Sequence, residues 1–147
     1  MNPQRAVRIE VKVAVVRALQ DALKSGRCHA LGDGMCVRID DRTVCEPDAV
    51  VYCGEKIGDD TTVMTNSVVV VDVLSPGTKT VDTTRKLESY FKLASVRHYL
   101  IVDPKSRAIV HHARDAAGAI ATFVLSEGEV ALSEIDARMP VASFFPA

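Results

Sequence analysis

The sequence predicts a domain of the α/β (α+β) class, in which a mixed β-sheet is flanked by helices. Residues 67–74 form an almost continuous run of apolar, mostly β-branched residues, which is typical of a central strand covered on both faces. Residues 7–24 and 82–93 instead place apolar residues at steps of three and four, the spacing of a helix with one buried face. Short alternating segments bounded by turn residues predict further strands.

The first predicted element is the helix over residues 7–24. Its apolar positions recur at helical spacing and are Val11, Val15, Ala18, Leu19 and Leu23. Ser25 and Gly26 follow directly, and glycine is the residue most often found just after the end of a helix. We therefore expect the helix to end near residue 24.

A β-hairpin is predicted next. Residues 35–39 alternate between apolar and polar types, and Asp40–Asp41 is a candidate tight turn, which would place Cys36 opposite Cys45. The outgoing strand is predicted to run over residues 43–53, where Pro47 marks a bulge or a sheet edge. The polar residues 54–66 predict a loop.

The central strand over residues 67–74 is followed by a turn at residues 75–78 and by the second helix, which Thr80 or Asp82 would cap. Later apolar segments predict strands over residues 98–102, 108–112, 119–125 and 129–132, and a terminal turn of helix or strand over residues 141–145. The order of elements indicates a mixed sheet.

Length and composition indicate one domain over residues 1–147. The chain is 48% hydrophobic and 25% charged, which is typical of a folded globular protein. Its net charge of -1 lacks the basic excess of many nucleic-acid binders, although a nuclease needs acidic residues for metal binding. The longest apolar run is far shorter than the roughly 20 residues that span a bilayer. We expect no membrane association and a cytoplasmic location.

The four cysteines, Cys28, Cys36, Cys45 and Cys53, are eight or nine residues apart and form no Cys-x-x-Cys pair. We interpret them as small buried apolar side chains rather than as a disulfide or a metal site. Histidines receive a similar interpretation. His111 and His112 are neighbours on a strand and point to opposite faces, and His98 is predicted to be a packed side chain rather than a base.

Asp72 is the charge that most needs an explanation. An unpaired carboxylate among buried valines is unfavourable unless it is protonated, paired or bound to a metal. Asp48 also lies beside an apolar run, directly after Pro47, and two such acids suggest a site for a hard cation such as Mg²⁺. Lys86 is available from the following helix, with Asp82 one turn before it, to activate water or stabilise a phosphate.

Several motifs occur in an order that resembles the Uma-two family, whose members are described as restriction-endonuclease-like domains within the PD-(D/E)xK superfamily. The motifs are Glu46-Pro47-Asp48, the central strand with Leu74-Ser75-Pro76, the helix with Asp82, Lys86 and Tyr90, and the strand that ends at Asp103-Pro104. The similarity covers residues 7–145. It implies a restriction-endonuclease-like fold.

The resemblance also implies roles for individual residues. Asp48 corresponds to the acid of the PD element and Asp72 to the acid of the (D/E)xK element, both of them expected to bind Mg²⁺ or Mn²⁺. Leu74 stands where the superfamily has its lysine, and Lys86 would replace that lysine from the next helix. Lys12 matches a lysine position of relatives and is a candidate phosphate contact.

The sequence departs from the family pattern at three places. Asp72 stands where relatives usually have glutamate, and Arg8 lies near a position where many have histidine. Most relatives also begin with a hairpin that carries an acidic motif, and this sequence begins after it. Glu10 is the early glutamate available as a substitute.

Three functions are compatible with the sequence. The first is a Mg²⁺- or Mn²⁺-dependent endonuclease that cleaves DNA, with Asp48 and Asp72 as metal ligands and Lys86 as the catalytic lysine. The second is a catalytically inactive domain of the same fold that binds nucleic acid or a protein partner. The third is a dimerising domain whose C-terminal strands and residues 141–145 form an apolar contact surface, and a homodimer is also compatible with the first function.

Overall fold

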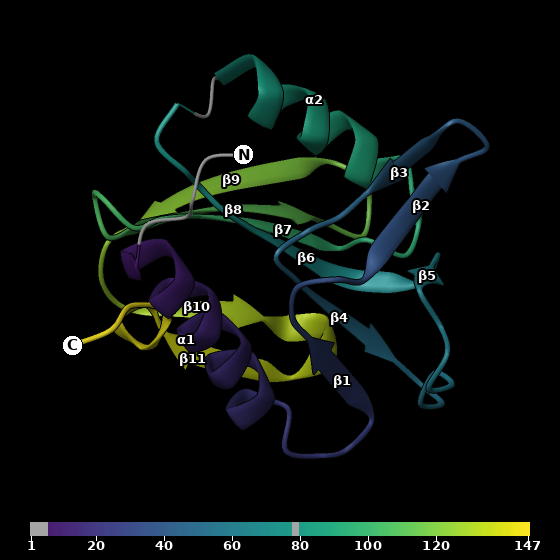
Figure 1. Cartoon of the computed structure of the whole chain (residues 1–147), viewed down its shortest axis with the longest axis horizontal. Coiled ribbons are helices and arrows are strands. Elements are labelled where there is room, and N and C mark those ends of the chain that lie inside the picture. Colours follow the sequence, from purple (N-terminus) through teal and green to yellow (C-terminus); the bar gives the residue numbers. More distant parts are fainter. Residues whose placement is uncertain (1–5, 78–79) are drawn as a thin grey trace.

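The structure is a computed structural model that describes residues 6–77 and 80–147, and its centre is a six-stranded mixed sheet (Figure 1). The strand order is β1-β4-β6-β7-β8-β9, and neighbouring strands are antiparallel except for the parallel pair β6 and β7. The strands are β1 (Cys28–Leu31), β4 (Ala49–Cys53), β6 (Ser67–Val73), β7 (His98–Asp103), β8 (Ala108–Arg114) and β9 (Ile120–Leu125). The predicted mixed sheet is therefore confirmed.

Two smaller sheets accompany the main one. The first has the order β3-β2-β5, with β2 (Cys36–Asp40), β3 (Thr43–Cys45) and β5 (Val63–Met64). The second is the hairpin of β10 (Glu129–Leu132) and β11 (Ala137–Pro140), joined by the short 3-10 helix η1 (Ser133–Ile135) and followed by η2 (Val141–Phe144).

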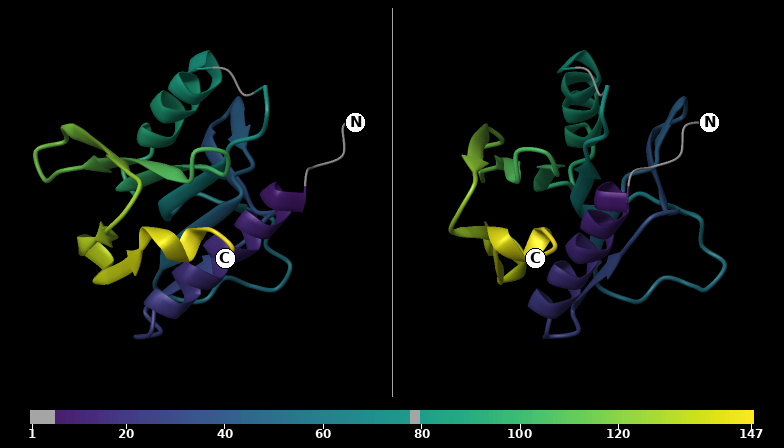
Figure 2. Two further views of the ribbon diagram at one scale, coloured as in Figure 1. Left: turned by 90° about the vertical axis from the view of Figure 1, so that its left-hand side faces the viewer. Right: turned by 60° about the vertical axis from the view of Figure 1, so that its left-hand side comes forward.

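Two helices cover opposite faces of the main sheet (Figure 2). Helix α1 (Ala6–Ala22) shares one apolar core with β10, β11 and η2, to which it contributes the expected Val11, Val15, Ala18 and Leu19. Helix α2 (Thr80–Phe91) shares the second core with β2 and β5 through Tyr90. Each helix agrees with its predicted range to within two residues. No helix in the described part of the chain is long and apolar enough to cross a membrane.

Strand β6 alternates between the two cores as predicted. Val69, Val71 and Val73 belong to the core beneath α1, and Val70 belongs to the core beneath α2. Asp72 lies on the α2 side, two residues after Val70 along the strand. The polar side chain of β6 therefore faces the second helix.

The strand predicted over residues 43–53 is broken in two. Strand β3 ends at Cys45, and β4 begins at Ala49 in a different sheet. Pro47 lies in the gap, where its missing N–H prevents a continuous ladder. The predicted loop over residues 54–66 contains β5, a two-residue strand that pairs with β2. Strands β1 and β11 were not predicted either. Such short strands form because they pair with neighbouring strands, and their own sequence gives little signal.

The hairpin of β2 and β3 also differs from the predicted register. Val37, not Cys36, lies opposite Cys45. The turn residues are Asp41 and Arg42, and the backbone N–H of Arg42 donates a hydrogen bond to the Asp40 side chain at 2.9 Å. A bulge lies between Arg38 and Asp40. The bulge shifts the pairing by one residue.

The predicted capping role of Thr80 lies outside the described side chains. The other predicted cap, Asp82, is in the first turn of α2.

The interpretation of all four cysteines as simple apolar side chains is wrong for two of them. Cys28 and Cys53 form a disulfide between β1 and β4, where they are directly opposite each other with Cα atoms 3.9 Å apart. Recognition of this pair requires strand β1, which the sequence did not reveal. Cys36 and Cys45 are free thiols, as expected.

The predicted apolar contact surface at residues 141–145 is also wrong. Val141, Phe144 and Phe145 are buried in the core beneath α1, so they are unavailable to a partner. The same prediction also named the C-terminal strands, and the edge strand β9 does carry exposed apolar side chains, Phe123 and Val124.

His98 is a packed residue, as predicted. It is almost fully buried, it is hydrogen-bonded through Nδ1 to His111 at 2.8 Å, and its Nε2 contacts Glu134 of η1. His111 and His112 point to opposite faces, and burial lowers the pKa of His111 to about 4. This neutral histidine pair therefore attaches η1 to the sheet.

The disulfide yields a stability prediction. The bridge joins residues 25 apart in sequence, and closing a loop of this length in the unfolded chain is worth about 3 kcal/mol. Reduction with dithiothreitol should lower the free energy of unfolding by that order in urea titrations. The double variant Cys28→Ser/Cys53→Ser should show no response to the reductant, and an equal response in both proteins would contradict the assignment.

Candidate active site

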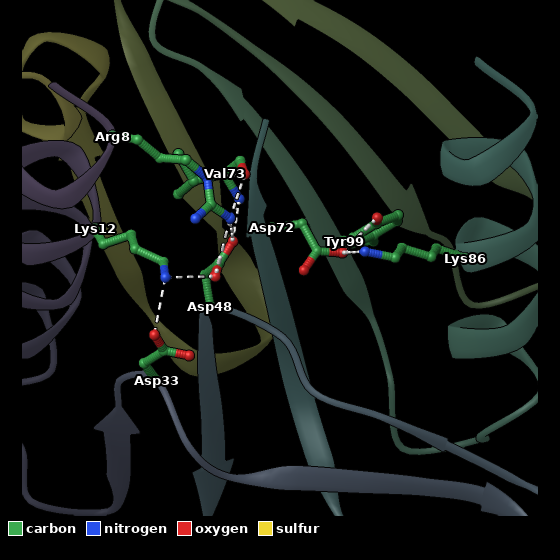
Figure 3. A network of polar contacts seen from close by, with 8 residues as sticks. All are labelled: Arg8, Lys12, Asp33, Asp48, Asp72, Val73, Lys86 and Tyr99. Carbon is green, nitrogen blue, oxygen red and sulfur yellow. Dashed lines mark hydrogen bonds and ion pairs between the residues drawn. The ribbon is translucent and has the colours of Figure 1, made fainter. Parts of the chain in front are cut away.

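The two predicted acids lie at the same end of the central sheet. Strands β4 and β6 are antiparallel with Ala49 opposite Val71, and the Asp48 N–H donates a hydrogen bond to the Val71 carbonyl at 2.9 Å. Asp48, which precedes β4, therefore lies beside Asp72 near the end of β6. Both acids line a pocket of about 130 Å³ between α1 and α2 (Figure 3).

Asp48 is surrounded by donors. Its Oδ2 accepts the backbone N–H of Val73 at 2.7 Å, which joins β4 to the end of β6. The Arg8 guanidinium approaches both carboxylate oxygens, at 3.2 and 3.4 Å, and the Lys12 ammonium lies 3.2 Å from Oδ1. Lys12 also binds Asp33 at 2.8 Å. Asp48 thus has two cations from α1 as partners.

Asp72 has different partners on the other side of the pocket. The Tyr99 hydroxyl donates a hydrogen bond to its Oδ2 at 2.8 Å, and the Lys86 Nζ lies 3.6 Å from the same oxygen. Burial raises the pKa of Asp72, and the nearby Lys86 charge opposes that rise. The Lys86 side chain is 47% exposed, so solvent screens its ammonium, which compensates only part of the buried charge.

Arg8 completes a link between the strands. Its Nε and Nη2 donate hydrogen bonds to the Val73 carbonyl at 3.2 and 3.1 Å while Nη2 also contacts Asp48. The sequence identified Arg8 only as a departure from the family pattern. Its place three residues before Val11, on the buried stripe of the helix, was the signal that this cation faces the protein interior.

The structure places the other predicted residues as follows. Lys86 and Asp82, one turn apart on α2, both line the pocket with the two acids. Lys12 is beside Asp48. Glu10 is exposed on α1 and does not line this pocket. Glu46, an exposed residue on the pocket wall, was not predicted to be part of the site.

The donor chemistry of the pocket fits a hard divalent cation. Asp48 and Asp72 offer carboxylate oxygens, and the Val73 carbonyl lies beside Asp48, linked to it through Arg8. Among residues 6–77 and 80–147, no group of three or more His, Cys, Asp and Glu side chains is placed to hold an ion. Magnesium sites commonly use one or two carboxylates and complete the shell with water and phosphate oxygens. The pocket therefore fits an open site rather than a protein cage.

The mixed sheet with its flanking helices is a restriction-endonuclease-like fold. The chain belongs to the Uma2 family, described as "Putative restriction endonuclease", whose sequence pattern matches residues 1–138. The family resemblance seen in the sequence is thus confirmed.

A solved structure supports the same fold. The chain is similar to the crystal structure of a protein from Anabaena variabilis described as a "putative nuclease belonging to DUF820". The TM-score is 0.78 with 14% sequence identity, over 98% of this chain and 83% of that one. At this identity the likeness establishes the fold. No curated protein matches the sequence significantly.

The two acids should respond differently to neutralisation. Asp48→Asn removes the counter-charge of Arg8 and Lys12, so the free energy of unfolding of the metal-free protein should fall by about 2 kcal/mol. Asp72→Asn removes a buried charge whose pKa is raised, so stability at pH 7 should be kept or increased. Urea titration of both variants measures these changes.

The pH dependence gives a control for Asp72. Because its folded pKa lies above the unfolded value, ionisation opposes folding at neutral pH, and this effect disappears as the pH falls below the unfolded value of about 3.8. Any advantage of Asp72→Asn over the unsubstituted protein should therefore shrink on acidification. An advantage that grows on acidification would contradict the assigned environment.

Proposed function

We propose that the protein is a Mg²⁺- or Mn²⁺-dependent endonuclease that cleaves DNA phosphodiester bonds. The observation that carries the proposal is the convergence of Asp48, Asp72 and Lys86 on one pocket, from two neighbouring strands and the following helix. This is the acid, acid and lysine set of a PD-(D/E)xK site, with the lysine supplied by α2 instead of β6. Membership of a family described as "Putative restriction endonuclease" supports the same class of reaction.

Asp48, Asp72 and the Val73 carbonyl are the residues that would hold the metal. A bound divalent cation would supply Lewis-acid stabilisation of the negative charge that develops on the phosphate, and would lower the pKa of water. The protein fixes these donors firmly, because Asp48 is held by the Val73 N–H and Asp72 by the Tyr99 hydroxyl. Fixed donors need little rearrangement during the reaction.

Lys86 is proposed as the catalytic cation. Its ammonium lies 3.6 Å from Asp72 and its side chain is half exposed, so it can reach a water or a phosphate oxygen in the pocket mouth. There it would position the attacking water and stabilise charge on the phosphate. Asp82 lines the same pocket one turn earlier on α2 and is placed to orient the lysine.

The proposed substrate is DNA, although the chain has a net charge of -1. The two acids are nevertheless matched by basic partners, because Arg8 and Lys12 lie at Asp48 and Lys86 lies at Asp72. Lys12 stays a candidate phosphate contact. The exposed position of Glu10 outside the pocket does not favour an accessory role for that residue.

One observation favours the alternative of a catalytically inactive domain that binds nucleic acid or protein. Asp48 already has two basic partners and Asp72 has one, so the acids also have a structural explanation. A cytoplasmic location, a homodimer and one domain over residues 1–147 stay predictions.

Substitution of the lysine tests the proposal. Lys86→Met should slow Mn²⁺-dependent cleavage of plasmid DNA at least about 100-fold, since it removes a charge that acts in the transition state. The matched control is Lys92→Met, because Lys92 is an exposed lysine just after the end of α2 and does not line the pocket. Gel electrophoresis of timed digests, with and without a chelator, measures the rates.

Equal rates for Lys86→Met and the unsubstituted protein would remove Lys86 from the mechanism. Absence of metal-dependent cleavage of both duplex and single-stranded DNA by the unsubstituted protein would favour the inactive alternative.

A further inference from the structure

Arg8 is a pocket cation that contacts both the Asp48 carboxylate and a backbone carbonyl. Its guanidinium contacts oxygens of two different strands, the Asp48 carboxylate and the Val73 carbonyl, at 3.1 to 3.4 Å (Figure 3). These are two of the three protein groups that would hold a divalent cation. The Arg8 side chain is only 16% exposed, so this contact is an ordered part of the protein interior.

A guanidinium at this position competes with a metal ion. Arg8 and a divalent cation would use the same oxygens, and two positive charges at one carboxylate repel each other strongly in a partly buried site. Lys12 already provides a second positive charge at Asp48. Metal binding to the substrate-free protein therefore requires that Arg8 leave Asp48 or that the metal bind with fewer ligands.

The structure provides a place for Arg8 to go. A second cavity, of about 620 Å³, adjoins the acidic pocket, and Arg8, Leu74 and Ser75 line both. Rotation of side-chain bonds would carry the guanidinium from one cavity to the other without a change in α1. Lys105 and Asp103 also line the second cavity, so its two basic side chains outnumber its one acid and leave a net positive charge for an anion.

A phosphate is the anion best suited to draw Arg8 away. The guanidinium group matches phosphate oxygens in a bidentate manner, and the larger cavity lies directly beside the proposed cleavage site. Phosphate binding by Arg8 would withdraw the guanidinium from the Asp48 carboxylate and the Val73 carbonyl at the same time, and would leave Lys12 as the one cation at Asp48 among the pairs described above.

We propose that Arg8 is a built-in cation that holds the metal position in the substrate-free protein and releases it when a DNA phosphate binds its guanidinium in the adjoining cavity. The proposal rests on the endonuclease function proposed above and adds to it an order of binding. Metal and DNA then bind cooperatively, because each is favoured by the same displacement of Arg8. The site then binds metal more weakly in the absence of substrate than in its presence.

Calorimetric titration of Mn²⁺ tests this order. In the absence of DNA, Arg8→Ala should bind Mn²⁺ about tenfold more tightly than the unsubstituted protein, because the competing cation is gone. Arg8→Gln, which keeps a hydrogen-bond donor for the Val73 carbonyl without the charge, should show the same gain and guards against a folding defect in the alanine variant. Arg17→Ala is the control, since Arg17 is an exposed arginine of the same helix.

The second part of the experiment adds a short DNA duplex with cleavage-resistant phosphorothioate linkages. The duplex should tighten Mn²⁺ binding to the unsubstituted protein and to Arg17→Ala, and should have a much smaller effect on both Arg8 variants. Equal Mn²⁺ affinity of the unsubstituted protein and the Arg8 variants without DNA would overturn the role of Arg8 while leaving the endonuclease proposal intact. Absence of Mn²⁺ binding in every variant, with and without DNA, would overturn both.

Discussion

The Asp48 carboxylate is the group on which the geometry of the candidate site depends. Through the Val73 N–H it joins the start of β4 to the end of β6, and through Arg8 and Lys12 it joins both strands to α1. The antiparallel pairing of β4 with β6 ends at Ala49 opposite Val71, so the Asp48 side chain extends the contact between the two strands to Val73. The Asp48 side chain thus holds the start of β4, the end of β6 that carries Asp72, and helix α1 close together.

Asp72 differs from Asp48 in that its charge is only partly compensated by its partners. It lies on a strand that is buried on both faces, on the side covered by α2, and burial disfavours its ionised form. Tyr99 donates one hydrogen bond, and Lys86 supplies a charge that is partly exposed to solvent. Together they offset only part of the cost of burying the Asp72 carboxylate. A divalent cation would stabilise the ionised form of such a carboxylate, which supports the proposal that the two acids share one ion.

The sequence predicted the central elements because their signals are strong. The valine run of β6 and the helical spacing of α1 come from residues that are buried in the structure, and the positions of Asp48, Asp72 and Lys86 followed from motifs on those elements. Short strands such as β1 and β5 were missed because pairing with neighbours, rather than their own composition, specifies them. The Cys28–Cys53 disulfide was missed for the same reason, since only the pairing of β1 with β4 makes the two cysteines neighbours. The contacts of Arg8 depend on the tertiary approach of α1 to the strand ends, which no local pattern measures.

The central claim is that Asp48 and Asp72 share one divalent cation. Crystals of the protein with Mn²⁺ and a cleavage-resistant DNA duplex, measured at the manganese absorption edge, test this claim most directly. The account predicts an anomalous peak roughly 2.0–2.6 Å from oxygens of both carboxylates, with the Arg8 guanidinium turned away from Asp48. An anomalous map without a peak at these carboxylates, with Arg8 still bound to Asp48 in the presence of DNA, would contradict it.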